Sequence, residues 1–190
     1  MVLSKTGRPR EFNRDCALRA ALELFWRCGY AATSLDDLTG AMGIGRSSFY
    51  ASFGSKHAVL LEALEVYTGE LLASMKAAVE SAIDPQSAVL AILEIVACTR
   101  EPTHGCFFVN SVTELFPADA EVADLARRYL SDVDQQVAAL LHQLGFSPAE
   151  SRIRGGAMLA LATGAITLRK AGESSKRIES MLNLLSLLIT

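Results

Sequence analysis

The sequence predicts an all-α protein of about nine helices. Apolar residues recur at helical spacing along most of the 190 residues, and no segment shows the period-two alternation of a strand. A capping residue followed by proline marks helix starts at Asp84-Pro85 and Ser147-Pro148. The sequence contains no internal repeat, and its length allows one or two hydrophobic cores.

The first predicted helix begins after Asn13, which suits an N-cap, and ends near Cys28 because Gly29 follows. Its apolar residues recur every three or four positions, as expected for one buried face. They are Ala17, Leu18, Ala21, Leu22, Leu24 and Phe25.

A short helix and a glycine-rich turn come next. The helix is expected over residues 35–42, and Ser34 with Asp37 forms the capping-box pattern of a helix start. Gly43 ends this helix, since a residue without a Cβ adopts the left-handed conformation at little cost. Gly45 then opens the following helix.

The helix after the turn is expected over residues 46–52 and has room for only two turns. Phe49 and Phe53 are four residues apart and share its buried face. Arginine can read guanine or bind a phosphate, and serine and tyrosine hydroxyls commonly contact phosphates. The pattern is typical of a helix-turn-helix, whose second helix enters the DNA major groove. The alternative is a tight helix corner with solvated polar residues. The residues expected to face outward are Arg46, Ser47, Ser48, Tyr50 and Ala51.

Six further helices are expected. The first begins after the capping residue Ser55, so that its free N–H groups and Lys56 suit a DNA phosphate. The six cover residues 56–81, 85–99, 104–116, 119–144, 148–171 and a last segment that begins at Ser174.

Charge is distributed unevenly along the chain. Residues 1–60 carry a net charge of +3, and residues 61–190 carry −6. This distribution indicates that DNA contact is confined to the N-terminal region. Arg8 and Arg10 lie in a non-helical segment at the start of the chain. This basic arm either follows DNA phosphates and reaches a minor groove, or is a disordered tail.

Several classes of protein are excluded by what the sequence lacks. It contains no uncharged apolar stretch of about 18 residues and no signal-peptide core, so we expect a cytoplasmic protein without membrane contact. The four cysteines are then expected to be reduced, and they form no Cys-x-x-Cys zinc pattern. Because no catalytic triad, phosphate loop or metal cluster is visible, we expect no enzyme activity, no metal and no cofactor.

A family resemblance rests on residues from about 10 to 60. This region resembles the N-terminal motif of the tetracycline-repressor-like (TetR/AcrR) transcriptional regulators. The runs that carry the resemblance are Ala20-Ala21-Leu22-Glu23-Leu24-Phe25, Gly29-Tyr30, Thr33-Ser34-Leu35-Asp36-Asp37-Leu38 and Gly43-Ile44-Gly45-Arg46-Ser47-Ser48-Phe49-Tyr50-Ala51-Ser52-Phe53-Gly54-Ser55-Lys56.

The resemblance implies a homodimeric repressor of two domains. Residues 1–54 would form the DNA-binding domain, and residues 55–190 the helical ligand-binding and dimerisation domain. A palindromic operator would be the DNA partner, and a small-molecule effector would release it. Family members often carry serine or threonine where Gly45 stands. The residues expected at the DNA are Thr33, Ser34, Gly45, Arg46, Ser47, Ser48, Tyr50, Lys56, Arg8 and Arg10.

The last two helices would form the dimer interface. The penultimate helix is rich in glycine and alanine between residues 155 and 165, and small residues permit close helix approach. The alternative is that these residues pack inside one subunit.

The effector site is expected around residues 105–114, which resemble a segment of one subset of these regulators. Aromatic residues, including Phe108 and Phe116, would line an apolar cavity, and a few polar groups would orient the ligand. The alternative is that the aromatic residues are ordinary core. The residues expected at the effector are Tyr67, Cys106, Phe107, Asn110, Ser111, Glu114 and Tyr129.

Cys106 suggests an alternative function. It lies near a predicted helix start, where the helix dipole favours a thiolate, and His104 is close in sequence. A thiol-based sensor of oxidants or electrophiles, with Cys98 as resolving partner, is therefore an alternative. A buried cysteine acting as a small apolar residue is another. A third is a helical adaptor that keeps this fold and binds proteins.

Overall fold

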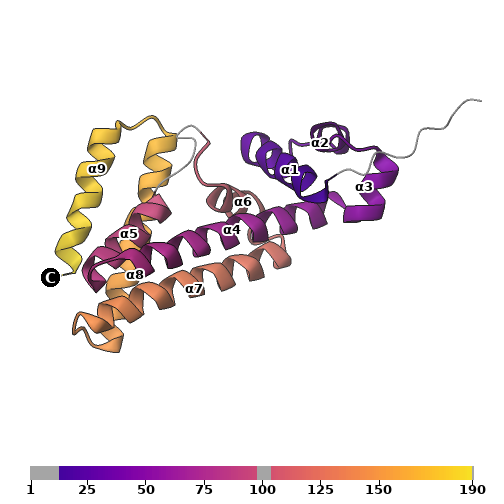
Figure 1. Cartoon of the computed structure of the whole chain (residues 1–190). Helices are drawn as coiled ribbons and strands as arrows, with labels where there is room; N and C mark the ends of the chain where they lie inside the picture. Colours follow the sequence, from indigo (N-terminus) through magenta and orange to yellow (C-terminus); the bar gives the residue numbers. More distant parts are fainter. Residues whose placement is uncertain (1–12, 98–103, 190) are drawn as a thin grey trace, which may run out of the picture. The chain divides into compact units, whose positions relative to one another are not determined.

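The computed structural model describes residues 13–97 and 104–189. Within these residues the protein forms nine α-helices and one 3₁₀-helix, without a strand (Figure 1), so the all-α prediction is confirmed. Arg8, Arg10 and Cys98 lie outside the described residues. The elements are α1 (Arg14–Cys28), α2 (Leu35–Met42), α3 (Arg46–Phe53), α4 (Lys56–Ser81), α5 (Pro85–Ala97), α6 (Phe107–Leu115), α7 (Ala120–Gln143), α8 (Pro148–Lys170), α9 (Ser175–Asn183) and η1 (Leu184–Leu188).

The chain divides into two compact units, Met1–Ala63 and Leu64–Thr190, and the division falls within α4. The predicted domain boundary after residue 54 remains a prediction. No helix in the described ranges is both long and apolar enough to cross a membrane.

The N-terminal unit contains α1, α2, α3 and the start of α4. Each of these helices contributes a large apolar side chain that is at most 2 % exposed, namely Phe25, Leu38, Phe49 and Leu60. Asn13 caps α1 as predicted, because its side chain accepts a hydrogen bond from the Cys16 amide. The unit is small, so contacts at its edge also matter for stability.

Arg14 links three helices of this unit. Its guanidinium donates to both carboxylate oxygens of Glu62, at 2.8 and 2.7 Å, and lies 4.5 Å from the centre of the Phe53 ring. Both charged side chains remain partly exposed, at 45 % for Arg14 and 33 % for Glu62, so we expect a modest stabilisation.

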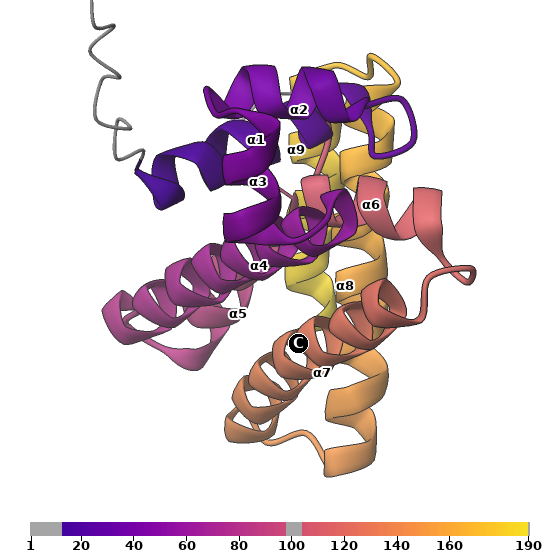
Figure 2. The same ribbon diagram turned by 90° about the vertical axis from the view of Figure 1, so that its right-hand side faces the viewer.

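The second unit is built around α7 and α8, and Figures 1 and 2 both show α8 crossing α7. α5 packs on both of these helices, α6 packs on α7, and α9 packs on α8. Gly155 permits the close approach of α7 and α8, because a Cβ at this position would lie 3.2 Å from Val137 Cγ1. Met158 and Leu141 are fully buried in this unit.

The small residues of α8 are divided between two faces. One set is buried and packs inside the unit, as the alternative interpretation of the sequence expected. The buried set comprises Gly155, Ala162 and Ala165. The exposed set comprises Gly156, Ala157, Ala160 and Gly164.

One helix, α6, is clearly shorter than predicted. α6 begins at Phe107 instead of near His104, because Gly105 has a φ of +69° and Cys106 is extended. α9 ends at Asn183, and the chain then tightens into η1.

We expect the Arg14–Glu62 pair to show a measurable coupling energy. In a double-mutant cycle of Arg14→Ala and Glu62→Ala, the coupling should be about 0.5–1 kcal/mol, because the pair is bidentate but partly exposed. Urea unfolding followed by the fluorescence of Trp26, the only tryptophan, reports on this unit.

The control for this cycle is Arg27→Ala, since Arg27 is also an exposed arginine of α1. A coupling energy near zero, or an equal loss of stability in Arg27→Ala, would contradict the assigned role of Arg14.

Candidate functional site

The start of α2 is fixed by the predicted capping box. The Ser34 hydroxyl accepts a hydrogen bond from the Asp37 amide at 3.1 Å, and the Asp37 carboxylate accepts one from the Ser34 amide at 3.0 Å. Hydrogen bonds from the Ser34 hydroxyl and amide hold the pKa of Asp37 below its usual value. Two N–H groups that a helix start leaves free are therefore satisfied locally.

The turn between α2 and α3 depends on glycine. Gly43 ends α2 in the left-handed conformation with a φ of +67°, as predicted. The Ile44 amide then donates to the Thr39 carbonyl at 3.2 Å, which closes the turn. Gly45 occupies the N-cap of α3 and has no side chain to cap it.

The two faces of α3 differ as predicted. Phe49 and Phe53 are buried, and their ring centres are 6.0 Å apart. The opposite face is polar and open to solvent, and its largest side chain, Tyr50, is 55 % exposed. The exposed residues at the start of this face are Arg46, Ser47 and Ser48.

Arg46 is paired with Asp36 across the turn. Asp36 Oδ1 accepts hydrogen bonds from Arg46 Nε at 3.0 Å and from Nη2 at 2.6 Å. Both side chains are well exposed, at 63 % and 74 %. The sequence analysis did not anticipate this pair, which holds the guanidinium beside α2 and neutralises part of its charge.

Two other predicted DNA contacts have different surroundings. Thr33 is 2 % exposed, and its hydroxyl donates to the Gly29 carbonyl at 2.6 Å. The prediction that Thr33 faces DNA is therefore corrected, because this side chain is turned inward to close the end of α1. Lys56 is half-buried, and its Nζ lies 4.3 Å from the centre of the Tyr30 ring.

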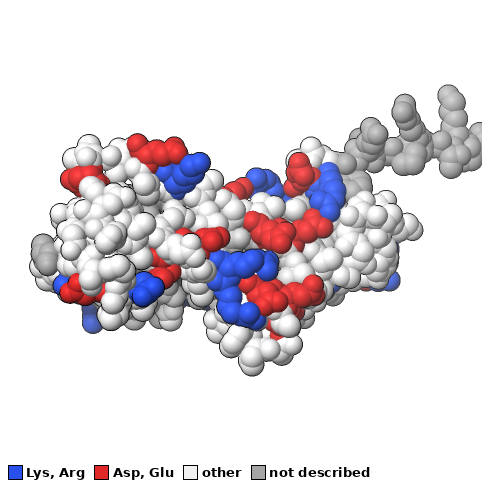
Figure 3. Space-filling model, turned by 90° about the horizontal axis from the view of Figure 1, so that it is seen from below, with Lys and Arg blue, Asp and Glu red and all other residues white. Residues whose placement is uncertain are grey.

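Charge does not mark a nucleic-acid surface on the face of the molecule shown in Figure 3. On this face, basic and acidic side chains lie next to one another. In the described part of the N-terminal unit, the geometry of α2 and α3 marks the candidate interface. Arg8 and Arg10 of the predicted basic arm lie outside the described residues.

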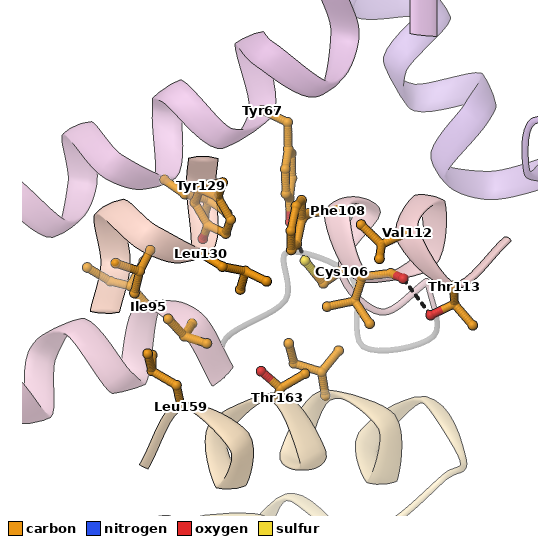
Figure 4. A pocket seen from close by; sticks show the side chains of 15 residues that line it. Tyr67, Ile95, Cys106, Phe108, Val112, Thr113, Tyr129, Leu130, Leu159 and Thr163 are labelled. Carbon is orange, nitrogen blue, oxygen red and sulfur yellow. Dashed lines mark hydrogen bonds between the residues drawn. The ribbon is translucent and has the colours of Figure 1, made fainter. Parts of the chain in front are cut away.

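The second unit contains a cavity of about 210 Å³ (Figure 4). Its wall is mainly apolar and draws on five helices. Examples are Leu71 of α4, Ile95 of α5, Val112 of α6, Val133 of α7 and Leu159 of α8. A largely apolar cavity with a few polar groups is the usual form of a small-molecule site.

Three of the predicted effector residues line this cavity, namely Tyr67, Cys106 and Tyr129. The Tyr67 hydroxyl donates to Cys106 Sγ at 3.4 Å, and the Tyr129 ring packs against Phe108 with a centre-to-centre distance of 4.6 Å. Burial raises the pKa of both tyrosines, and the nearby Cys106 raises it further. Both hydroxyls are therefore protonated hydrogen-bond donors at neutral pH.

The other four predicted effector residues do not line this cavity, because they lie on the other face of α6. Positions three and four apart share a face of a helix. Phe108, Val109, Val112 and Thr113 form the face that lines the cavity. The residues on the other face are Phe107, Asn110, Ser111 and Glu114.

The side chains on this other face of α6 are engaged in contacts outside the cavity. Phe107 is 1 % exposed and meets Tyr67 edge-on, while Ser111 is also buried. Asn110 donates to the His104 carbonyl at 2.7 Å and accepts a bond from Lys170 at 3.0 Å.

One further expectation is corrected. Phe116 was expected to line the cavity, but it is 55 % exposed and does not contribute to the wall. Glu114 is likewise exposed at the surface. Glu114 lies in the last turn of α6 and Phe116 just beyond it.

Residues 17–63 match the family model described as bacterial regulatory proteins, tetR family. This N-terminal region therefore carries the helix-turn-helix motif of the tetR family. The resemblance found in the sequence is thereby confirmed. The match includes all of α2 and α3 and therefore the helix-turn-helix described above.

Curated relatives include two repressors of this type. The HTH-type transcriptional repressor ComR of Escherichia coli (strain K12) is 35 % identical over 65 % of this chain and 60 % of that protein. The HTH-type transcriptional repressor BdcR of the same organism is 28 % identical over 65 % of this chain and 62 % of that protein. The matched region thus spans about 60 % of the length of these TetR relatives.

Solved structures share the fold over most of the chain. A TetR-family transcriptional regulator from Streptomyces coelicolor superposes with a TM-score of 0.83 at 22 % identity, over 93 % of both chains. A cysteine mutant of the TetR-family regulator CifR, complexed with 26-bp double-strand operator DNA, superposes with a TM-score of 0.77 at 25 % identity, over 96 % of this chain and 98 % of that one.

Across residues 13–97 and 104–189, no group of three His, Cys, Asp or Glu side chains could hold a metal ion. Cys16 and Cys28 are exposed, whereas Cys106 is buried. The thiol that lines the cavity is therefore the least accessible of the three described.

We expect thiol reagents to follow this order of exposure. Cys16 and Cys28 should react with iodoacetamide at least about tenfold faster than Cys106 in the native protein, because reaction at Cys106 requires local opening. Peptide mass spectrometry over a time course measures each rate. Equal rates in denaturant serve as the control, and a fast Cys106 in the native protein would contradict its burial.

Proposed function

We propose that this chain is a transcriptional regulator, acting as a repressor, that binds a palindromic operator as a homodimer. The observation that carries the proposal is the polar outer face of α3, which exposes Arg46, Ser47, Ser48 and Tyr50 on a helix whose other face is buried. A helix of this kind can enter the major groove, with arginine at base edges or phosphates and hydroxyls at phosphates.

The relatives support the same proposal. ComR and BdcR are named as transcriptional repressors, and the CifR mutant is complexed with operator DNA. Regulators of this kind act on DNA and are not enzymes, so the proposal places the chain in the cytoplasm without catalytic activity. The adaptor alternative leaves the exposed Arg46, Ser47 and Ser48 without a role.

The proposal includes control by a small molecule in the cavity of the second unit. The effector would favour one arrangement of the dimer and DNA another, so the two would weaken each other's binding by the same factor. The cavity of about 210 Å³ supports this part, since its wall is apolar and includes Tyr67, Cys106 and Tyr129. It also accommodates the alternative in which a reagent acts on Cys106.

The test of DNA binding is fluorescence anisotropy with duplexes from the region flanking the gene. The wild type should bind one duplex selectively and more weakly as salt rises. Arg46→Ala should weaken this binding about tenfold to hundredfold, because the side chain contributes base or phosphate contacts. Arg152→Ala, an exposed arginine of α8, is the control and should bind as the wild type does. Equal binding by Arg46→Ala and the wild type would reject the assignment of α3.

Asp36 is expected to restrain binding to random DNA. Asp36→Asn removes the carboxylate that pairs with Arg46, and should raise the affinity for random duplexes about threefold to tenfold while lowering selectivity. Asp15→Asn makes the same charge change at an exposed position of α1 and is the control. An equal effect of the two variants in the anisotropy assay would show that only net charge matters.

Dimerisation is expected through exposed apolar residues of α8, α9 and η1. Leu161 is 53 % exposed, Leu184 is 59 % exposed and Leu187 is 65 % exposed. Large apolar side chains that remain exposed together mark an interaction surface. The exposed small residues of α8 would allow a partner helix to approach closely.

The double variant Leu161→Glu/Leu184→Glu should be monomeric by light scattering, because it places charges in this surface. It should also lose selective DNA binding, since one subunit contacts only half of a palindrome. Ile83→Glu, at a 92 % exposed position between α4 and α5, should remain dimeric. A dimeric double variant would refute this interface.

A further inference from the structure

Two hydroxyls in the wall of the cavity, those of Tyr129 and Thr163, make no hydrogen bond to the described residues. The Tyr129 side chain is 7 % exposed, and its hydroxyl makes no hydrogen bond within the described part of the chain. In Figure 4 the hydroxyl end of this side chain points toward other residues that line the cavity. Because the Tyr129 hydroxyl is not among the fully buried atoms that lack a partner, it is accessible from the cavity and can donate to a molecule there.

The chemistry of this hydroxyl defines what it needs. Burial raises the pKa of Tyr129, so the group is a protonated donor at neutral pH. The neighbouring Tyr67 hydroxyl already donates to Cys106 Sγ at 3.4 Å. Tyr129 therefore remains available to donate to an acceptor that enters the cavity.

The rest of the wall favours an uncharged occupant. Among the described residues, no Asp, Glu, Lys, Arg or His side chain lines the cavity. The Thr113 hydroxyl donates to the Val109 carbonyl, and Thr163 adds one hydroxyl from α8. A charged group would lose its hydration here without gaining a counter-ion.

The size of the cavity limits the occupant further. An apolar cavity of about 150 Å³ in another protein holds benzene. The cavity in this chain measures about 210 Å³, which suits a six-membered ring with a small substituent or a chain of similar volume.

We propose that this cavity binds a small, uncharged, mainly apolar molecule with one hydrogen-bond acceptor, such as a carbonyl oxygen, and that the Tyr129 hydroxyl donates to it. The role of this molecule as an effector rests on the function proposed above. Its binding does not, because the site lies wholly within the second unit.

The test uses three probes of similar size: acetophenone carries the acceptor, cumene replaces it with carbon, and benzoate carries a charge. Calorimetric titration of the full chain measures the affinity of each probe. Tyr129→Phe should weaken the binding of acetophenone about threefold to tenfold, which corresponds to the loss of one hydrogen bond. The same variant should bind cumene as tightly as the wild type does, or slightly more tightly. Benzoate should show no measurable binding.

Tyr67→Phe is the matched control inside the same cavity. Because the Tyr67 hydroxyl already bonds to Cys106, this variant should change the affinities for acetophenone and cumene by the same factor. Tyr129→Phe keeps the ring and loses no protein hydrogen bond, so its melting temperature should equal or exceed that of the wild type. This measurement separates a lost ligand contact from a damaged fold.

Three results would overturn the proposal: no binding of either neutral probe, benzoate binding as tight as acetophenone, or an equal effect of Tyr129→Phe on both neutral probes. DNA affinity with and without acetophenone is measured separately. Tyr129-dependent binding that leaves DNA affinity unchanged would uphold the site and reject only its role as effector site.

Discussion

The burial of Phe49 and Phe53 determines which face of α3 is exposed. A helix of eight residues is not stable alone, so α3 depends on packing against its neighbours. Once the two phenylalanines enter the core, helical geometry places Arg46, Ser47 and Tyr50 outside. The proposed recognition surface therefore follows from a packing constraint, and the polar residues contribute little to stability themselves.

The same geometric rule explains the cavity of the second unit. α6 places one row of residues against the interior and another against the cavity, and Phe107 and Phe108 belong to different rows although they are adjacent. The interior row is fixed by contacts of Phe107 with Tyr67 and of Asn110 with Lys170. The cavity row of α6 keeps only apolar residues and Thr113, so the free hydroxyls of the wall, on Tyr129 and Thr163, come from α7 and α8.

Local features of the fold were predictable from sequence, and features that depend on packing were not. The Ser34–Asp37 capping box and the left-handed Gly43 involve residues close in the chain, so their patterns are sufficient. The orientation of α6 depends on its packing against α4, α7 and α8. Because both faces of α6 carry apolar residues, its sequence does not show which face lines the cavity. Thr33 was misassigned because a hydroxyl in a loop is equally able to face DNA or close a helix end.

The Arg46–Asp36 pair marks a different limit of sequence analysis. The two residues are ten positions apart and meet only because the turn brings the starts of α2 and α3 together. Charged residues at that spacing carry no periodic signal. The pair matters for the proposed function, since DNA must compete with Asp36 for the guanidinium.

Selection of bound sequences from a randomised pool of duplex DNA tests the central claim most directly. The account predicts enrichment of a palindrome whose half-sites are centred about 10 bp apart, or a multiple of this, because a dimer presents two copies of α3. Parallel selection with Arg46→Ala should relax or lose defined positions within each half-site. No enriched sequence with the wild type, or an identical motif with Arg46→Ala, would contradict the claim that α3 reads DNA.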